Sequence, residues 1–156
     1  MSAVIKLPLL QFRPMDESDL PAVMEIEVKA YPFPWSKIIF QDCLQVGYCC
    51  WVLERDFELV AYAIMSIGAG ESHILNLCVS PQFQGQALGS TMLDHMLEIA
   101  QKHSADTAFL EVRPTNFGAI KLYFNAGFDE VGIRRNYYPA KCGREDALIL
   151  ARALIE

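Results

Sequence analysis

The chain has 156 residues, of which 53% are hydrophobic and 21% are charged, and its formal net charge at pH 7 is −6. A chain of this length and composition can bury one core without disulfides or metal, so we expect a single domain over residues 1–156. It contains no apolar run of the roughly 18 residues that a membrane helix needs. Its acidic balance argues against a nucleic-acid surface, which requires clustered Lys and Arg.

The cysteine, histidine and N-terminal patterns exclude several further classes. The five cysteines form no C-x-x-C pair, and His73, His95 and His103 lack the spacing of an H-E-x-x-H site. We therefore expect no metal, and histidines in ordinary surface or packing positions. Residues 1–8 lack the basic cluster and apolar run of a secretory leader, which predicts a cytoplasmic protein. We expect a monomer or a weak dimer.

The N-terminal half begins with a strand and two helices. Asp16, Ser18 or Asp19 can cap the first helix, and Ser36 can cap the second after a loop that its two prolines keep from being helical. A charged turn over 55–58 predicts an antiparallel hairpin. The expected elements are a strand over 9–15, a helix over about 20–28, a helix from 36 to about 44, and strands over 49–54, 59–67 and 72–79.

The C-terminal half alternates strands and helices. Apolar residues at steps of three and four predict an amphipathic helix over 86–103, and Gly127 can close a second helix over 116–125. Strands are expected over 107–112, 128–137 and 146–154. Helices that connect strands here require a crossover, whereas the upstream hairpin is antiparallel, so we predict a mixed sheet.

A glycine-bearing turn over 84–90 joins a predicted strand to a predicted helix. Unpaired N–H groups at a helix N-terminus suit a phosphate or pyrophosphate, although glycine in such a turn can also serve only to bend the chain. The turn is not G-x-G-x-x-G, and no G-x-x-x-x-G-K-[ST] occurs, so dinucleotide and nucleoside-triphosphate sites lose support.

The segment from Val79 to Gly89 resembles the acetyl-CoA signature of the GNAT family, strand-V-x-P-x-x-Q-x-x-G-x-G-helix. It departs from that pattern at Ala87, which replaces the first glycine of the pair. Gly85 and Ser90 occupy positions where relatives often carry Arg or Lys. The resemblance therefore implies that phosphate binding depends more on backbone N–H groups in this chain.

Residues 111–128 resemble a second GNAT motif, E-V-x-x-x-N-x-x-A-x-x-L-Y-x-x-x-G-F, in the form seen in ribosomal-protein alanine N-acetyltransferases of the RimI type. The match extends through 134–139 and 143–147 and includes 33–36 near the start. The resemblance implies the GNAT fold, an α/β (α+β) domain whose mixed, mostly antiparallel sheet has about six to seven strands and about four helices on both faces. It also implies direct transfer, in a ternary complex, of acetyl from acetyl-CoA to the N-terminal alanine amine of small-subunit ribosomal protein number eighteen.

Glu111 and Tyr123 are the candidate catalytic residues. An α-ammonium has a pKa of roughly 7.7 to 8.0 in water and must lose a proton before it attacks. Glu111 lies between apolar residues that can raise a carboxyl pKa, and the resemblance assigns it as the base. The resemblance assigns Tyr123 as the acid that protonates the departing thiolate. The alternatives are a solvent-facing carboxylate and a packed aromatic ring.

The remaining candidates bind the cosubstrate or the acceptor. No histidine adjoins Cys78 in sequence, so we expect direct attack rather than an acyl-cysteine intermediate. Aromatic residues beside prolines can wall a groove for an extended peptide or simply pack over the core. The candidate acetyl-CoA contacts are Leu77, Cys78, Val79, Gln84, Gly85, Gln86, Ala87, Leu88, Gly89, Ser90, Asn116 and Tyr123, and the candidate acceptor contacts are Phe33, Trp35, Arg134, Tyr137 and Tyr138.

Two rival functions stay open at the level of sequence. The first is a GNAT enzyme with the same chemistry that acts on lysine side chains or a small amine. The second is a non-catalytic acyl-CoA-binding module, which the replacement at Ala87 favours and the retention of Glu111 and Tyr123 disfavours.

Overall fold

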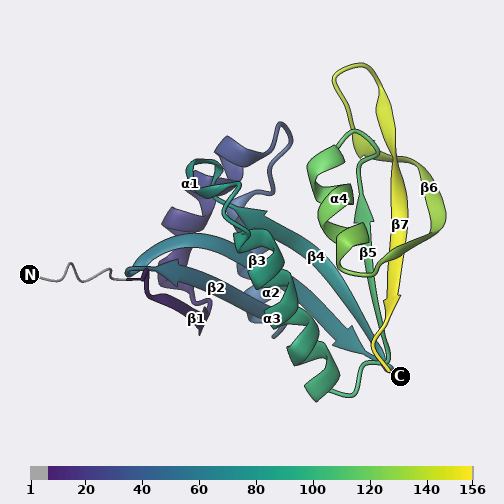
Figure 1. Cartoon of the computed structure of the whole chain (residues 1–156). Helices are drawn as coiled ribbons and strands as arrows, with labels where there is room; N and C mark the ends of the chain where they lie inside the picture. The colour runs from purple at the N-terminus through teal and green to yellow at the C-terminus, as the bar shows by residue number, and fades with distance from the viewer. Residues whose placement is uncertain (1–6, 156) are drawn as a thin grey trace, which may run out of the picture.

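The computed structural model describes residues 7–155, so most of the segment used to exclude a leader lies outside the described residues. A seven-stranded sheet, in the order β1-β2-β3-β4-β5-β7-β6, carries helices on both faces (Figure 1). Every predicted strand and helix is present, and the predicted fold class is confirmed. The elements are β1 (Leu10–Pro14), η1 (Glu17–Asp19), α1 (Leu20–Ala30), α2 (Lys37–Gln45), β2 (Cys49–Arg55), β3 (Glu58–Gly68), β4 (Glu71–Val79), η2 (Pro81–Phe83), α3 (Leu88–Lys102), β5 (Thr107–Val112), α4 (Phe117–Asn125), β6 (Asp129–Pro139) and β7 (Arg144–Ala153).

The sheet is mixed because one connection crosses over. Helix α3 returns the chain so that β5 lies parallel to β4, and the other neighbouring strands pair antiparallel. After α4 the chain passes beyond β5 to the sheet edge as β6, and β7 then folds back between β5 and β6. The strand that follows α4 in sequence is therefore not a neighbour of β5.

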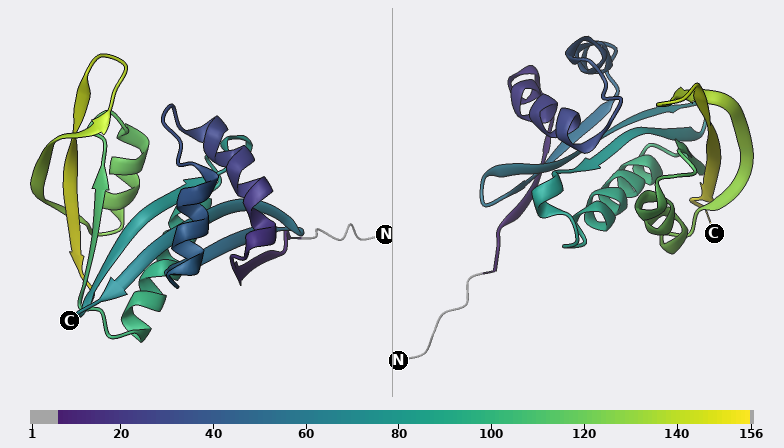
Figure 2. Two further views of the ribbon diagram at one scale, coloured as in Figure 1. Left: turned by 180° about the vertical axis from the view of Figure 1, so that it is seen from behind. Right: turned by 90° about the horizontal axis from the view of Figure 1, so that it is seen from above.

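The sheet separates two hydrophobic cores. Helices α1 and α2 cover one face, and α3 and α4 cover the other (Figure 2). Leu20 and Phe40 from the first helix pair pack against Tyr62 of the sheet, whereas Met92 and Leu93 of α3 belong to the second core. Helices can pack on both faces because the central strands carry apolar side chains on both faces, as in the buried stretch of β3.

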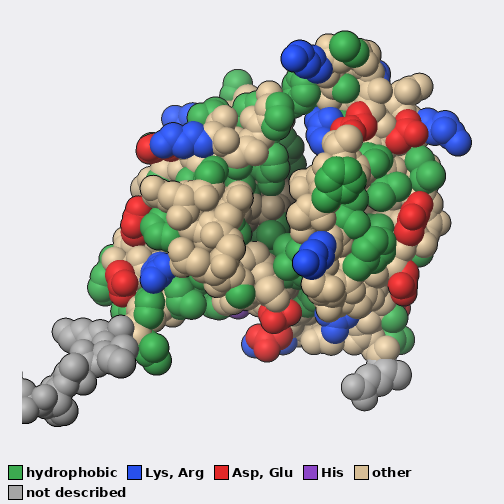
Figure 3. Space-filling view, turned by 45° about the horizontal axis from the view of Figure 1, so that its top comes forward, with side chains coloured by type: hydrophobic (Ala, Val, Ile, Leu, Met, Phe, Trp, Pro, Cys, Tyr) green, Lys and Arg blue, Asp and Glu red, His purple; other side chains and the backbone are tan. Residues whose placement is uncertain are grey.

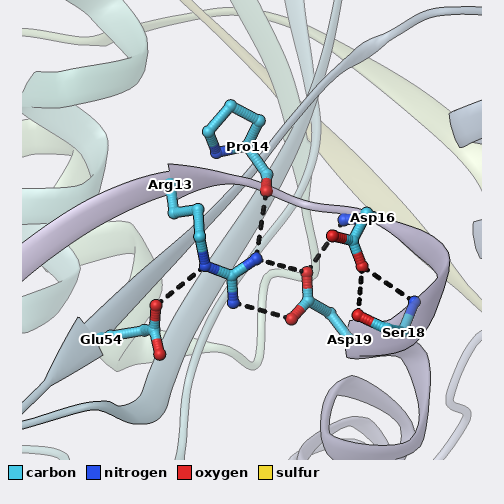
Figure 4. Close-up of polar contacts among 6 residues, drawn as sticks. All are labelled: Arg13, Pro14, Asp16, Ser18, Asp19 and Glu54. Atoms are coloured by element: carbon cyan, nitrogen blue, oxygen red, sulfur yellow. Dashed lines mark hydrogen bonds and ion pairs between the residues drawn. The ribbon is translucent and has the colours of Figure 1, made fainter.

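A polar cluster fixes the first strand to its neighbours (Figure 4). The Arg13 guanidinium donates to Glu54 on β2 at 2.9 Å and to both carboxylate oxygens of Asp19 at 2.8 and 2.9 Å. Asp16 caps η1 by accepting from the Ser18 N–H, and Asp19 accepts from the Asp16 N–H in return. Burial alone would raise the pKa of Asp19, but the hydrogen bonds from Arg13 and Asp16 lower it overall.

Replacing Arg13 with Ala is expected to lower the free energy of unfolding by about 1 to 2 kcal/mol, because the nearly buried carboxylate of Asp19 loses its bidentate partner. Urea unfolding measures this change. Arg135→Ala is the matched control, since Arg135 is exposed and lies 3.7 Å from Asp146. Equal stability of the two variants would show that the Arg13 cluster contributes nothing.

Candidate active site

The sheet opens between β4 and β5. These strands pair only from Glu71 with Thr107 to Ile74 with Leu110, although β4 continues to Val79. Beyond that point they diverge, and α3 and α4 begin on either side of the opening (Figure 1). A parallel pair that splays in this way leaves backbone groups of β4 without a neighbouring strand.

The backbone of Leu77 and Val79 faces this opening. The Leu77 carbonyl accepts from the Tyr31 hydroxyl at 3.0 Å, and the Val79 carbonyl accepts from the Gln84 side chain at 3.4 Å. In a strand the N–H and C=O of one residue point to the same side, so both N–H groups point away from β3 as well. The sequence-predicted residues Leu77 and Val79 therefore present polar backbone to the opening, while the Cys78 side chain is buried toward α1 and α2.

The predicted phosphate turn lies at the N-terminus of α3. Gly85 has φ +81°, and a Cβ built there would meet nothing within 4 Å. Ala87 is the N-cap residue, with φ 62° and no side-chain cap. The first N–H groups of α3, from buried Leu88 through exposed Ser90, have no carbonyl within the helix to bond. The turn therefore offers open space and a set of aligned donors, which fits a pyrophosphate.

The left-handed conformation of Ala87 explains why glycine is usual at this place, since a Cβ there costs about 1 to 2 kcal/mol. Ala87→Gly is expected to raise the free energy of unfolding by about 0.5 to 1 kcal/mol, net of the greater entropy of the unfolded chain, without weakening acetyl-CoA binding. Thermal unfolding and calorimetric titration measure both. Gly85→Ala should have the opposite effect on stability; a destabilised Ala87→Gly variant would contradict the assignment.

The other candidate acetyl-CoA contacts differ in their exposure and in their hydrogen-bond partners. Gly89 packs so closely that an added Cβ would lie 3.3 Å from Leu122. Gln86 is exposed and hydrogen-bonded to Arg55. Asn116 is the N-cap of α4 and accepts from the Ala119 N–H at 3.2 Å, so its side-chain oxygen is already used by the helix.

An irregularity in β4 changes which face its side chains occupy. The register with β3 shifts between Ile64 and Met65, which leaves Leu75 unpaired as a bulge. As a result Ile74 packs in the α3 core and Cys78 packs in the α1–α2 core. His73, next to Ile74, is therefore directed to the face opposite α3.

Glu111 lies on that same face, between the buried residues Leu110 and Val112 of β5. Its carboxylate lies 2.5 Å from Nε2 of His73 and 3.1 Å from Nε of Arg134. The hydrogen bond from His73 is the largest influence and, with Arg134, lowers the pKa of Glu111 although burial opposes it. The expectation of a raised pKa was wrong, because the hydrogen bonds to His73 and Arg134 outweigh the effect of burial among apolar neighbours.

Tyr123 lies on the other side of the sheet from Glu111. It is 7% exposed, belongs to the α3–α4 core and packs edge-on against Phe128 with ring centroids 5.8 Å apart. Burial and the neighbouring Cys78 raise the pKa of Tyr123, so the phenol keeps its proton near neutral pH. Among residues 7–155 no hydrogen bond is found for its hydroxyl. The protonated Tyr123 hydroxyl therefore lies beside β4 and is available to donate a hydrogen bond.

The candidate acceptor residues form two walls joined by an arginine that sequence reasoning missed. The Arg113 guanidinium lies 5.3 Å from the Phe33 ring centroid and 4.4 Å from that of Tyr138. Tyr137 and Tyr138 pack edge-on at 4.9 Å. Trp35 instead packs on Phe40 in the α1–α2 core, so the packing alternative holds for this residue.

A buried carboxyl group, also missed from the sequence, supports the loop between α1 and α2. Glu27 is 1% exposed. It accepts from the Tyr62 hydroxyl at 2.5 Å, from Asn76 Nδ2 at 3.1 Å and from the Trp35 N–H at 2.9 Å. It therefore ties β3, β4 and the aromatic loop together beneath the opening. A Glu inside an amphipathic helix, at a position spaced with Val23 on its apolar face, was the available signal.

A cavity of about 570 Å³ lies over the sheet beside Glu111. A separate hollow lies between the two halves of the molecule, with hydrophobic side chains along its walls, as the space-filling view from the top and the α3 side shows (Figure 3). The cavity is lined by Ser66, Ile67, Gly68, Glu71, Ser72, His73, Phe109, Glu111, Arg134 and Ile149.

Within residues 7–155 no helix is long and apolar enough to cross a membrane.

This fold and site define an acyltransferase: a helix N-terminus and a split strand pair on one side, a carboxylate and imidazole on the other. The family model of the acetyltransferase (GNAT) family matches residues 20–128. The [ribosomal protein bS18]-alanine N-acetyltransferase of Escherichia coli (strain K12) is 40% identical over 137 residues, which cover 88% of this chain and 93% of that protein.

Two solved structures have the same fold as this chain. The crystal structure of the ribosomal-protein-S18-alanine N-acetyltransferase from Escherichia coli has a TM-score of 0.88 and 37% identity, covering 95% of this chain and 96% of that one. Arabidopsis thaliana Naa50, solved with a bisubstrate analogue, has a TM-score of 0.80 at 20% identity, covers 92% of this chain and 98% of its own, and shares the fold. The chain belongs to the GNAT acetyltransferase family, and the predicted resemblance to its RimI-type enzymes is confirmed.

Proposed function

We propose that this protein transfers the acetyl group of acetyl-CoA to the N-terminal alanine amine of ribosomal protein bS18. The observation that carries the proposal is that the Glu111–His73 pair lies on one face of the sheet and the Tyr123 ring packs in the core of the other, both at the opening between β4 and β5. The similarity to enzymes named for this acceptor supports the choice of substrate. A ribosomal acceptor would place the reaction in the cytoplasm.

The residues of the opening fit acetyl-CoA, which supplies an activated thioester. The turn at Gly85 and Ala87, with the first N–H groups of α3, would hold the pyrophosphate. The N–H groups of Leu77 and Val79 would bond the pantetheine arm and polarise the acetyl carbonyl. The open space at Gly85 and the unpaired edge of β4 beyond Ile74 support this placement.

Acid and base roles follow from the two faces. The Glu111–His73 pair would remove a proton from the acceptor ammonium in the cavity, and Tyr123 would protonate the sulfur as it leaves. The Tyr31 hydroxyl is less suited to that second role, because it already donates to the Leu77 carbonyl at 3.0 Å.

The acceptor chain would enter between the Phe33 and Tyr138 walls, which Arg113 joins. Burial is the main cause of the raised pKa of Tyr138, and the nearby Glu111 carboxylate raises this pKa further. Tyr138 therefore lies close to Glu111. A peptide end that reaches Glu111 through this entrance would pass over aromatic rings, which suits an extended, unbranched N-terminus.

Two peptides test the proposal. One begins with a free N-terminal alanine followed by the bS18 sequence, and the other is blocked at its N-terminus and contains lysine. Incubation with acetyl-CoA is expected to add one acetyl mass to the first peptide and none to the second. Acetylation of the lysine peptide alone would establish the lysine-directed rival, and tight CoA binding without transfer to either peptide would establish the non-catalytic one.

A further inference from the structure

His73 is the one histidine of the described chain that contacts a candidate catalytic residue. Its Nε2 lies 2.5 Å from the Glu111 carboxylate, and about a third of its side chain is exposed to the cavity. The bulge at Leu75 is what directs it there, since the strand upstream of the bulge has the opposite alternation. The sequence expectation of an ordinary surface or packing histidine does not describe this position.

The hydrogen bond fixes which ring nitrogen carries the hydrogen. The hydrogen bonds to His73 and Arg134 lower the pKa of Glu111 and keep it ionised, and an ionised carboxylate only accepts hydrogen bonds. Nε2 of His73 must therefore donate, so the neutral ring keeps its lone pair on Nδ1. Among residues 7–155 no hydrogen bond to Nδ1 is found. The lone pair is directed away from Glu111 and is available to a ligand.

Glu111 itself is a weaker candidate for holding the proton. Both of its oxygens are engaged, one by His73 and the other by Arg134. Its lowered pKa makes the carboxylate a poor proton acceptor from an ammonium ion, whereas an imidazole is matched to proton transfer near neutrality. A carboxylate that orients an imidazole and stabilises its protonated form is a well-suited arrangement for a base.

We propose that His73 is the catalytic residue that accepts the proton of the acceptor ammonium at Nδ1, and that Glu111 is the positioning residue that orients it. This rests on the proposed function. One N–H bond of the ammonium breaks, one Nδ1–H bond forms, and the electron pair left on the amine attacks the thioester carbonyl carbon. As the C–S bond breaks, the sulfur takes the proton of the Tyr123 hydroxyl, and the second proton lost by the nitrogen restores that hydroxyl. The imidazolium then returns its proton to solvent through its exposed side.

The charged groups around His73 are Glu71 on its own strand, Glu111 on β5 and Arg134 on β6, whereas β3 contributes uncharged Ser66 to this part of the cavity. Among these charged groups the cation is Arg134, and its guanidinium is already paired with the Glu111 carboxylate at 3.1 Å. The surroundings therefore permit a transient positive charge on the ring.

His73→Gln tests the proposal, because the glutamine amide can still donate to Glu111 but cannot accept a proton. With the alanine peptide, kcat/KM is expected to fall by at least about tenfold at pH 7, where only about a tenth of an α-amine is neutral, and to approach the wild-type value above about pH 9. His103→Gln, at the C-terminal end of α3, is the matched control and should keep wild-type activity. Circular dichroism checks that each variant is folded.

A second measurement does not depend on turnover. The ¹⁵N chemical shifts of the His73 ring in the free enzyme are expected to show the Nε2–H tautomer, and Glu111→Gln should remove that preference. Wild-type kcat/KM in His73→Gln at pH 7, a deficit that stays constant with pH, or an Nδ1–H tautomer would each overturn the proposal. If wild-type enzyme acetylates only the blocked lysine peptide, the proposed function fails, and the same variant is then expected to remain impaired up to about pH 10.

Discussion

Tyr123→Phe is expected to lower kcat by about 100-fold while the KM for acetyl-CoA changes by less than about threefold. The substitution removes one hydroxyl from a ring that packs on Phe128 and leaves the packing surface in place. The hydroxyl is protonated and makes no hydrogen bond within residues 7–155, so its loss leaves no other group unpaired. Steady-state kinetics with the alanine peptide measures the effect.

Tyr48→Phe is the control for this experiment, since Tyr48 is exposed and lies just before β2, away from the opening. Its kcat should match that of the wild-type enzyme. A Tyr123→Phe enzyme with kcat within twofold of wild type would remove Tyr123 from the reaction and leave it as a packed aromatic residue.

Glu27→Ala is expected to lower the free energy of unfolding by about 3 to 5 kcal/mol. The change leaves two buried donors, the Tyr62 hydroxyl and the Asn76 amide, and the partly buried Trp35 N–H without their acceptor. Because the Trp35 N–H belongs to the loop that carries Phe33, the KM for the peptide should also rise. Urea unfolding and peptide kinetics measure the two effects.

The neighbouring acidic residue provides the matched control. Glu25, on the same helix, is exposed and forms an i,i+4 pair with Lys29 at 3.2 Å. Glu25→Ala should cost less than about 0.5 kcal/mol and leave the peptide KM unchanged. If the two variants were equally stable, the buried network around Glu27 would not hold the loop.

Local chemistry made most of the fold predictable. Ser36 caps α2 as expected, accepting from the Ile39 N–H, and the strand over 107–112 has the predicted bounds. The position of β7 between β5 and β6 was not predictable, because it depends on which strands meet after the chain has collapsed rather than on any segment's own pattern.

The site was predictable where its residues were local in sequence. The turn at Ala87 was found from glycine spacing, but the strain at its left-handed φ appears only in the structure. The partners of Glu111 come from β4 and β6, far away in the chain, and they reverse the direction of its pKa shift. The Leu75 bulge leaves no mark in the residue pattern, so the side on which His73 lies could not be inferred.

The most direct test of the central claim uses one peptide that carries both kinds of amine. A peptide with a free N-terminal alanine and an internal lysine is incubated with acetyl-CoA and the wild-type enzyme, and tandem mass spectrometry locates the added acetyl group. The structure and the family resemblance predict the label on the alanine nitrogen. A label found on the lysine side chain, with the N-terminus unmodified, would contradict the assignment.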